Sequence, residues 1–394
     1  MSMKRRRALV WIAGVALLGG AAILLDGASR AQNAGDTHHR NDERVRAARD
    51  QAWQIVAELA GSSADGVPQF ASWSRAEEIF GSEIVAHSTS KAQPAEPEII
   101  IFTFYNPQTE RHIRDHRLHA REQLDWLRAN GPIDLHTSDN RTVPPLPDGS
   151  VVVLTAWWPV AQEGSTAMPV WDPELNPPLR YGNSYATWAR VVGVSRTMPD
   201  SKSLAPLSFL GRTFPNSKRV ALDRFHHFRV DAALAQKLME DERTRKAAII
   251  ALGRGIEPGD SLALVALHVA AKRANTWHWA TLWWHDEPNA GEFAAGRPRL
   301  TAPWDNYLMD VAGAESESGE TDICFNPWLE ARFADGGSGG GTQSNCIACH
   351  QRASYPPVSF LPVTRGAPDF ENDPAYASDR LRTDFMWSIA RRAR

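Results

Sequence analysis

The sequence predicts an α+β fold with an antiparallel β core and flanking helices. Segments rich in β-branched and aromatic residues at 98–104 and 151–158 favour strands. Two apolar segments, 261–270 and 276–284, are separated by a short polar link, which is typical of an antiparallel hairpin. Apolar residues at helical spacing predict helices beside these strands, over 41–60, 109–129 and 231–252.

The N-terminus has the pattern of an export signal. Basic residues at 4–7 precede an unbroken apolar run, Ala8 to Leu25, and Ser29-Arg30-Ala31 offers the small residues that a signal peptidase reads. We therefore expect residues 1–31 to be a signal peptide and Gln32 to be a new N-terminus. A run of 18 apolar residues is also just enough to span a bilayer, so a retained membrane anchor is the alternative. Either way, the rest of the chain is expected in the periplasm.

Composition limits the remaining possibilities. The chain has 394 residues with 43% hydrophobic content, enough for a sizeable core, and its net charge of -3 gives no reason to expect nucleic-acid binding. Its three cysteines, Cys324, Cys346 and Cys349, are too few for a disulfide scaffold of this size. We expect a mixed α+β domain over 32–322 and a C-terminal segment over 323–394 packed on it.

The first half of the chain is divided by turn residues. Asn41 is expected to cap a helix that runs to Ala60, and Glu98–Phe104 reads as a strand. Thr109–Ala129 is predicted to be one helix that ends at Asn130-Gly131. A turn at 147–149 introduces the strand Val151–Trp158, and the Pro- and Gly-rich stretch 159–186 is expected to be a long loop.

The second half contains the clearest hairpin. A strand is expected at Thr187–Val194, and 231–252 has helical spacing that a polar stretch at 241–246 interrupts, so two shorter helices are also possible. The hairpin strands are joined by the polar link 272–275. Alternation along the second strand predicts one shared face for Trp277, Trp279, Thr281, Trp283 and His285.

Near the C-terminus lies the motif C-x-x-C-H, formed by Cys346, Cys349 and His350. Two thiols at this spacing reach the two vinyl groups of a haem, and the adjacent His points its imidazole at the iron. The motif therefore predicts one covalent haem c with His350 as the proximal iron ligand. The export signal agrees, because c-type haem is attached outside the cytoplasmic membrane.

Other interpretations of the cysteines are weaker. A thioredoxin-like redox pair would be expected in a βαβ context, and a zinc site would need a second pair of ligands at metal spacing. Cys324 is expected to be a small buried residue. Three histidines at helical spacing, His112, His116 and His119, suggest a metal face, but interleaved arginines favour a solvated helix face instead.

Two resemblances accompany the motif. As a whole it resembles the exported monohaem c-type cytochromes of proteobacteria, which are expected to have a tryptophan-rich strand, here 277–281, well upstream of a C-terminal haem site. It is less closely similar to the cytochrome P460 group, whose β-sheet domain carries C-x-x-C-H near its C-terminus. The matching segments are Leu146–Ser150, the motif and Asp384-Phe385. That group has a lysine cross-linked to haem, and since no lysine here can be assigned that role, its hydroxylamine chemistry is not expected.

The residue on the second face of the iron decides the function. Met386, His268 and His285 are the candidates for a distal ligand. A protein ligand there predicts single-electron transfer with a redox partner protein, which is the preferred function. An open position predicts a haem enzyme or a protein that binds peroxide or nitric oxide. A third hypothesis is a haem that serves mainly to stabilise the fold of a partner-binding protein.

Overall fold

The computed structural model describes residues 43–61, 67–81, 98–133, 140–176, 184–289, 291–312, 323–330, 344–358 and 369–394. The chain divides into two compact units, 1–42 and 43–394. The first unit, with the predicted signal peptide and the cap Asn41, lies outside the described residues. In the described part, no helix is long and apolar enough to cross a membrane.

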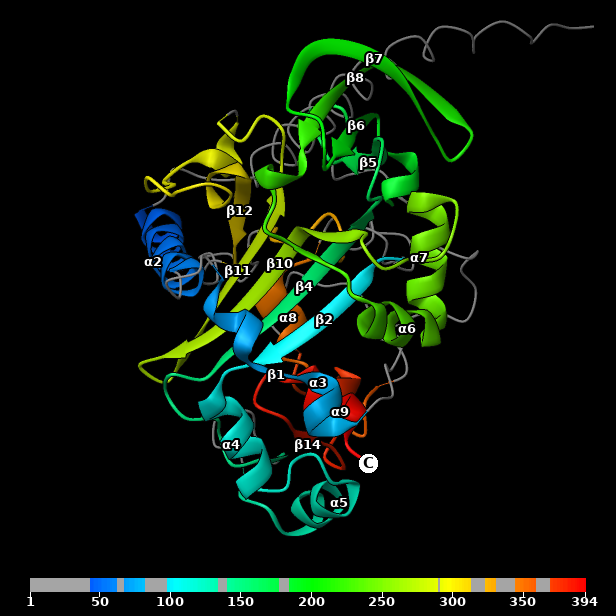
Figure 1. Ribbon diagram of the computed structural model, residues 1–394. Helices are drawn as coiled ribbons and strands as arrows, with labels where there is room; N and C mark the ends of the chain where they lie inside the picture. Colours follow the sequence, from blue (N-terminus) through cyan, green and yellow to red (C-terminus); the bar gives the residue numbers. More distant parts are fainter. Residues whose placement is uncertain are drawn as a thin grey trace, which may run out of the picture. The chain divides into compact units, whose positions relative to one another are not determined.

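A seven-stranded sheet forms the centre of the second unit, with the strand order β1-β2-β4-β10-β11-β12 and β9 paired to β10. Every pair in this sheet is antiparallel, which confirms the predicted antiparallel core and α+β class. The strands lie side by side in Figure 1. Their bounds are Ser74–Arg75 (β1), Ile100–Tyr105 (β2), Val151–Val160 (β4), His227–Arg229 (β9), Ser261–Arg273 (β10), Thr276–Trp284 (β11) and Tyr307–Val311 (β12).

The predicted hairpin is β10 and β11, but its link is shorter than expected. The strands stay paired as far as Arg273 and Thr276, so only Ala274 and Asn275 form the turn. Both have positive φ, 49° and 62°. A two-residue turn of this kind matches the right-handed twist of the strands, and the pairing therefore continues to the turn itself.

Helices flank this sheet, and one predicted helix is wrong. Residues 109–129 form two helices, α4 (Pro107–Asp115) and α5 (Arg121–Asn130), because Arg117 adopts φ 53° between them. For 231–252 the two-helix alternative is confirmed: the Asp241 side chain accepts a hydrogen bond from Thr244 N and starts α7 (Glu242–Leu252) directly after α6 (Ala232–Glu240). Helix α2 (Glu43–Ala60) packs against β11 and β12 (Figure 1).

A second, four-stranded sheet has the order β5-β6-β8-β7. The predicted loop 159–186 is wrong in part, because it contains β5, which pairs with β6. The expected strand 187–194 begins later, as β6. The bounds are Thr166–Val170 (β5), Arg190–Ser195 (β6), Ser201–Phe209 (β7) and Arg212–Ala221 (β8).

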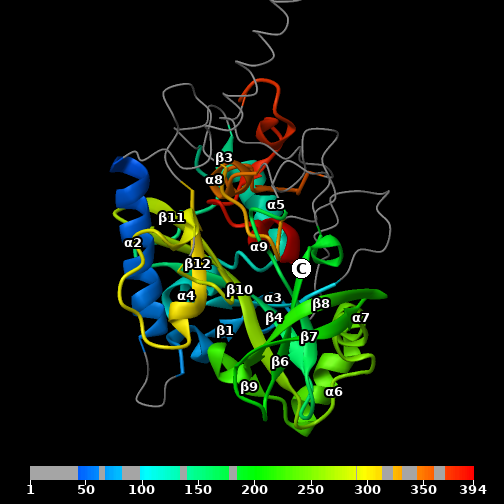
Figure 2. The same ribbon diagram turned by 90° about the horizontal axis from the view of Figure 1, so that it is seen from above.

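The C-terminal part is joined to the earlier part by a small three-stranded sheet, β13-β14-β3, in which β14 (Leu381–Arg382) pairs with β3 (Arg141–Thr142). The remaining elements are α3 (Ala76–Phe80), α8 (Cys346–His350), β13 (Ser354–Tyr355), α9 (Trp387–Arg392) and 3-10 turns at Gln69–Ser72, Tyr185–Thr187, Leu222–Arg224, Glu292–Ala294, Trp304–Asn306 and Pro374–Tyr376. Figure 2 shows α5, α8 and α9 grouped beyond one face of the main sheet.

Two large apolar clusters share the main sheet. The larger one contains most of β10 and the tryptophans Trp157, Trp158, Trp171 and Trp283. The other joins the far end of the hairpin to both cysteine segments and to the C-terminus, through Ala270, Trp277, Trp279, Cys324, Cys346 and Met386. The C-terminal segment therefore shares a core with the sheet and does not stand as a separate compact unit.

Candidate functional site

The C-x-x-C-H motif forms the short helix α8. Asn345 precedes it, and its side chain accepts a hydrogen bond from Ala348 N at 3.1 Å, which fixes the start of the helix. Cys346 and Cys349 are three residues apart and so lie on neighbouring positions of one helix face. Cys346 is buried, whereas Cys349 and His350 are partly buried.

A backbone carbonyl fixes the imidazole of His350. Its Nδ1–H donates to the Phe385 carbonyl oxygen at 2.8 Å, and because a carbonyl only accepts, the proton is on Nδ1. Nε2 is then the free nitrogen with a lone pair. Burial lowers the pKa of His350 to about 4, so the ring is neutral at pH 7. This is the state that a metal-ligating histidine requires.

The Phe385 carbonyl is itself held in place. Asp384 and Phe385 have φ values of 46° and 67°, a left-handed conformation that costs free energy for residues other than glycine. The Asp384 carboxylate accepts hydrogen bonds from Leu146 N (2.7 Å), Lys272 Nζ (3.0 Å) and Trp277 Nε1 (3.0 Å). These three bonds stabilise the strained segment that presents the carbonyl to His350.

The hairpin supplies the wall opposite α8. His268 pairs with Thr281, Ala270 with Trp279 and Lys272 with Trp277, so these side chains share one face of the sheet. The Trp279 ring centroid lies 4.1 Å from that of His350. The tryptophan face predicted by alternation therefore faces the motif at this end of β11.

His268 lies close to the motif on the same wall. Its ring centroid is 5.7 Å from that of His350, with an angle of 23° between the planes. Burial lowers its pKa to about 3, and His350 adds to the effect. The atoms His268 Nε2 and Trp279 Nε1 are buried without a hydrogen-bond partner among the described residues. The described residues give these two atoms no partner, so a water or a bound ligand would have to satisfy them.

All three thiols of the chain meet in this region. Cys324 Sγ lies 3.2 Å from Cys346 Sγ, and Cys346 Sγ lies 4.0 Å from His268 Nδ1. Cys324 is fully buried, as expected, but its contact with the motif was not foreseen. Burial raises the pKa of Cys349 to about 11 and that of Cys324 well above its usual value. The hydrogen bond with Cys324 is the largest influence on the pKa of Cys346 and lowers it, but burial and the Glu330 and Asp310 carboxylates together raise it, and the net shift is upward.

Of the three distal candidates, His268 is the one whose ring lies close to that of His350, at 5.7 Å between centroids. Met386 is buried in the shared core and directly follows the residue whose carbonyl binds Nδ1. His285 directly follows the end of β11 and lies four residues beyond Thr281, the residue that pairs with His268. Four residues of a strand span about 13 Å. Its Nδ1 accepts a hydrogen bond from Glu287 N.

The three histidines at helical spacing, for which a solvated helix face was expected, do not all lie on one helix, because α4 ends at Asp115. His112 Nε2 donates to the Pro144 carbonyl at 3.0 Å, and His119 lies beyond the end of α4. In the part of the chain that the structure describes, no group of three or more His, Cys, Asp or Glu side chains is arranged to hold a metal ion.

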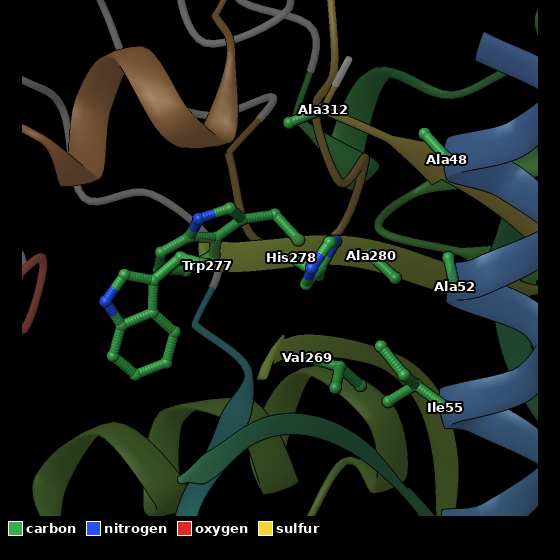
Figure 3. Close-up of a pocket in the computed structure, with 9 residues that line it drawn as sticks. Ala48, Ala52, Ile55, Val269, Trp277, His278, Ala280 and Ala312 are labelled. Carbon is green, nitrogen blue, oxygen red and sulfur yellow. The ribbon is translucent and has the colours of Figure 1, made fainter. Parts of the chain in front are cut away.

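A cavity of about 40 Å³ lies on the other side of β11, next to α2 (Figure 3). Figure 3 shows Ala48, Ala52 and Ile55 projecting from α2 toward β11, while Trp277 points away from them. His278 lines this cavity, and its Nε2 atom lies 3.3 Å from the Nε2 atom of Gln51. Ligand pockets for molecules of drug size measure several hundred Å³, so this cavity admits water but no porphyrin.

No family model, curated protein or solved structure matches the chain.

Proposed function

We propose that this chain is an exported c-type cytochrome that carries one haem through Cys346 and Cys349, with His350 as the proximal ligand, and that it transfers single electrons. The observation that carries the proposal is the hydrogen bond from His350 Nδ1 to the Phe385 carbonyl. It fixes the tautomer and the ring, and it leaves Nε2 for iron. A backbone carbonyl in this role is typical of metal-ligating histidines.

The thiol environment favours haem over the other uses of two nearby cysteines. A dithiol oxidoreductase needs an accessible thiol with a lowered pKa, whereas the pKa values of Cys346 and Cys349 are raised. A zinc ion needs four ligands in tetrahedral geometry, and the described residues offer no such group. Thioether formation requires two thiols at this spacing and an adjacent histidine.

The segments on which the resemblance to the P460 group rests support the proposal by their position. Leu146 N and Asp384 are hydrogen-bonded to each other, and Phe385 is bonded to His350. Hydrogen bonds thus link three stretches that are far apart in the sequence, and α8 is one of them. A haem supplies reversible one-electron chemistry at its iron. The chain would orient the iron ligand through Phe385 and shield one side of the site with Trp279.

Absorption spectra test this proposal. The exported protein is expected to show a covalent haem spectrum that survives denaturation and acid extraction. Cys346→Ala and Cys349→Ala should each weaken the attachment, and His350→Ala should remove the proximal ligand. A wild-type protein purified without covalent haem, from cells that attach haem to a known c-type cytochrome, would overturn the proposal.

A second candidate function is the binding or conversion of a small ligand at an open sixth position. The observation that favours it is the buried His268 Nε2, which has no hydrogen-bond partner among the described residues. His268 would then form a hydrogen bond to a small ligand that is bound to the iron, and would not itself bind the iron. Carbon monoxide added to the reduced protein separates the two functions. An unchanged spectrum means two protein ligands and electron transfer, and a shifted spectrum means an open or labile position.

Export is part of the proposal and has its own test. Mass spectrometry of the periplasmic fraction should detect a chain that begins at Gln32 if the signal is cleaved. A full-length chain in the membrane fraction would instead support the anchor, and a cytoplasmic chain would contradict both.

A further inference from the structure

We propose that Cys324 is a redox partner of the haem motif and forms a disulfide with Cys346 that must be reduced before haem is attached. The disulfide itself is inferred from the contact of the two thiols. Only its competition with haem attachment rests on the function proposed above.

The two sulfur atoms already touch. Cys324 Sγ and Cys346 Sγ are 3.2 Å apart, and a disulfide bond needs about 2 Å. The backbones are held together as well, because Cys324 N donates to the Ser344 carbonyl at 2.9 Å. The Cys346 thiol also donates to the Cys324 carbonyl at 3.5 Å. The two sulfurs must approach by about 1 Å to form the bond.

The segment around each cysteine also has hydrogen bonds that do not involve the other segment. Two residues after Cys324, Asn326 Nδ2 donates to Thr281 Oγ1 at 2.7 Å and to the Leu282 carbonyl at 3.0 Å, which fixes this segment on β11. On the other side, Asn345 caps α8 directly before Cys346. The fold thus brings together two thiols that are 22 residues apart in the sequence. No thiol hydrogen bond joins Cys349 to either sulfur among the described residues.

The oxidant is a protein disulfide of the thiol-exchange class, which meets the newly exported chain before folding buries the two thiols. The Cys346 thiolate attacks one of its sulfurs, forms a mixed disulfide and releases one thiol, which takes up a proton. The Cys324 thiolate then attacks the Cys346 sulfur, and the second oxidant thiol leaves and takes up the other proton. The chain loses two electrons and two protons, and the oxidant disulfide is reduced to two thiols.

The disulfide would change what the motif can do. With Cys346 oxidised, Cys349 is the remaining free thiol, and one thiol cannot make the two thioether bonds of a haem c. Reduction by a dithiol restores Cys346. Cys324 would thus protect Cys346 from further oxidation until haem arrives.

Peptide mapping of the exported protein, made in cells that cannot attach haem, tests the disulfide. Free thiols are alkylated at once and the chain is digested without reductant. Trypsin cuts after Arg299, Arg332 and Arg352, so Cys324 lies on a different peptide from Cys346 and Cys349. The expected result is a cross-linked pair of these peptides. Three alkylated cysteines, or a bond between Cys346 and Cys349 alone, would overturn the proposal.

Variants locate the bond. Cys349→Ser is expected to keep the cross-linked peptides, and Cys324→Ser and Cys324→Ala are expected to lose them. The alanine variant guards against misfolding caused by a buried hydroxyl. Loss of the cross-link in Cys349→Ser would show that Cys324 is bonded to Cys349 and not to Cys346. This result would contradict the inference.

Haem yield provides the second readout. In cells that attach haem but lack the reducing dithiol, Cys324→Ala is expected to carry more covalent haem than wild type, and the difference should vanish with added reductant. Equal haem yields for wild type and Cys324→Ala, with and without reductant, would show that the disulfide does not compete with haem attachment. Absence of haem from every variant, even with reductant, would overturn the proposed function while the peptide map still decides the disulfide.

Discussion

The Nδ1 atom of His350 lies 2.8 Å from the carbonyl oxygen of Phe385, and this contact ties α8 to the segment that leads into α9. The carbonyl belongs to a strained pair of residues, Asp384 and Phe385, both with positive φ. The strain is held by the Asp384 carboxylate, which is bonded to the hairpin and to Leu146. The orientation of the proposed iron ligand therefore depends on a buried ion pair that contacts no haem-attaching residue.

Asp384→Asn is expected to destabilise the fold and to reduce haem attachment. The substitution leaves the Lys272 ammonium, 6% exposed, without its countercharge. Breaking a buried pair in this way costs about 3 kcal/mol. Urea unfolding measures the stability and absorbance measures the haem yield. The matched control is Glu58→Gln, which breaks the exposed ion pair of the next residue, Arg273, and should cost less than about 1 kcal/mol. Equal stabilities for the two variants would show that the pair does not hold the segment.

If the chain carries the proposed haem, His268→Ala is expected to open the sixth position of its iron. His268 is the distal candidate that the structure places beside His350. If it is the second ligand, the reduced wild-type spectrum ignores carbon monoxide and the variant spectrum shifts. His285→Ala is the matched control and should behave as wild type, since His285 lies beyond the end of β11. A wild-type spectrum that shifts with carbon monoxide contradicts this assignment and favours the small-ligand function.

Much of this site could be predicted from local sequence. The motif, the tryptophan face of β11 and the antiparallel hairpin each depend on spacing within one element, and spacing is visible in the sequence. The partners of His350 and Asp384 were not predictable, because the hydrogen bonds join residues that lie between 35 and 238 positions apart. The approach of Cys324 to Cys346 was missed for the same reason.

The errors in the fold also have physical causes. The break between α4 and α5 depends on Arg117 at φ 53°, a conformation for which arginine gives no sequence signal. Strand β8 (RTFPNSKRVA) contains a proline and does not alternate, so its pairing with β7 and β6 was not foreseen. His285 was proposed from alternation alone, which gives the face of a strand but not the position along it.

The protein should begin to lose stability as the pH falls through 6.5. This is a higher pH than that at which carboxylates titrate. Burial lowers the pKa of His226 to about 4, because its ring stacks on Trp304 and meets the edges of Phe70 and Trp157. Between pH 6.5 and 4 the unfolded chain binds a proton at this position and the folded chain does not, so stability falls as the pH falls. This residue accounts for about 2 kcal/mol between pH 7 and pH 5.

His226→Gln tests this assignment. Urea unfolding is measured at pH 7 and pH 5 for both proteins, and the variant is expected to lose less stability between the two values. Comparing each protein with itself removes the packing cost of the substitution. An unchanged difference would assign the acid sensitivity to other groups.

Ala274→Gly is expected to stabilise the hairpin by about 1 kcal/mol. Ala274 has φ 49°, a conformation that glycine adopts without the penalty that a Cβ imposes. Gln236→Gly, at an exposed position in the middle of α6, is the control and should destabilise by about 0.5 kcal/mol. Thermal unfolding measures both. A loss of stability in Ala274→Gly would mean that the turn conformation differs from the one described.

Strand β10 is buried along its length except at its last residue, and it contributes to both apolar clusters. Every strand of the main sheet precedes Cys324 in the chain, whereas the two motif cysteines follow it. During synthesis, which proceeds from the N-terminus, the sheet can complete its pairing before any cysteine has been made. If the motif binds haem as proposed, a haem-attaching enzyme would meet it on a chain in which the hairpin, with Trp277 and Trp279, has already formed.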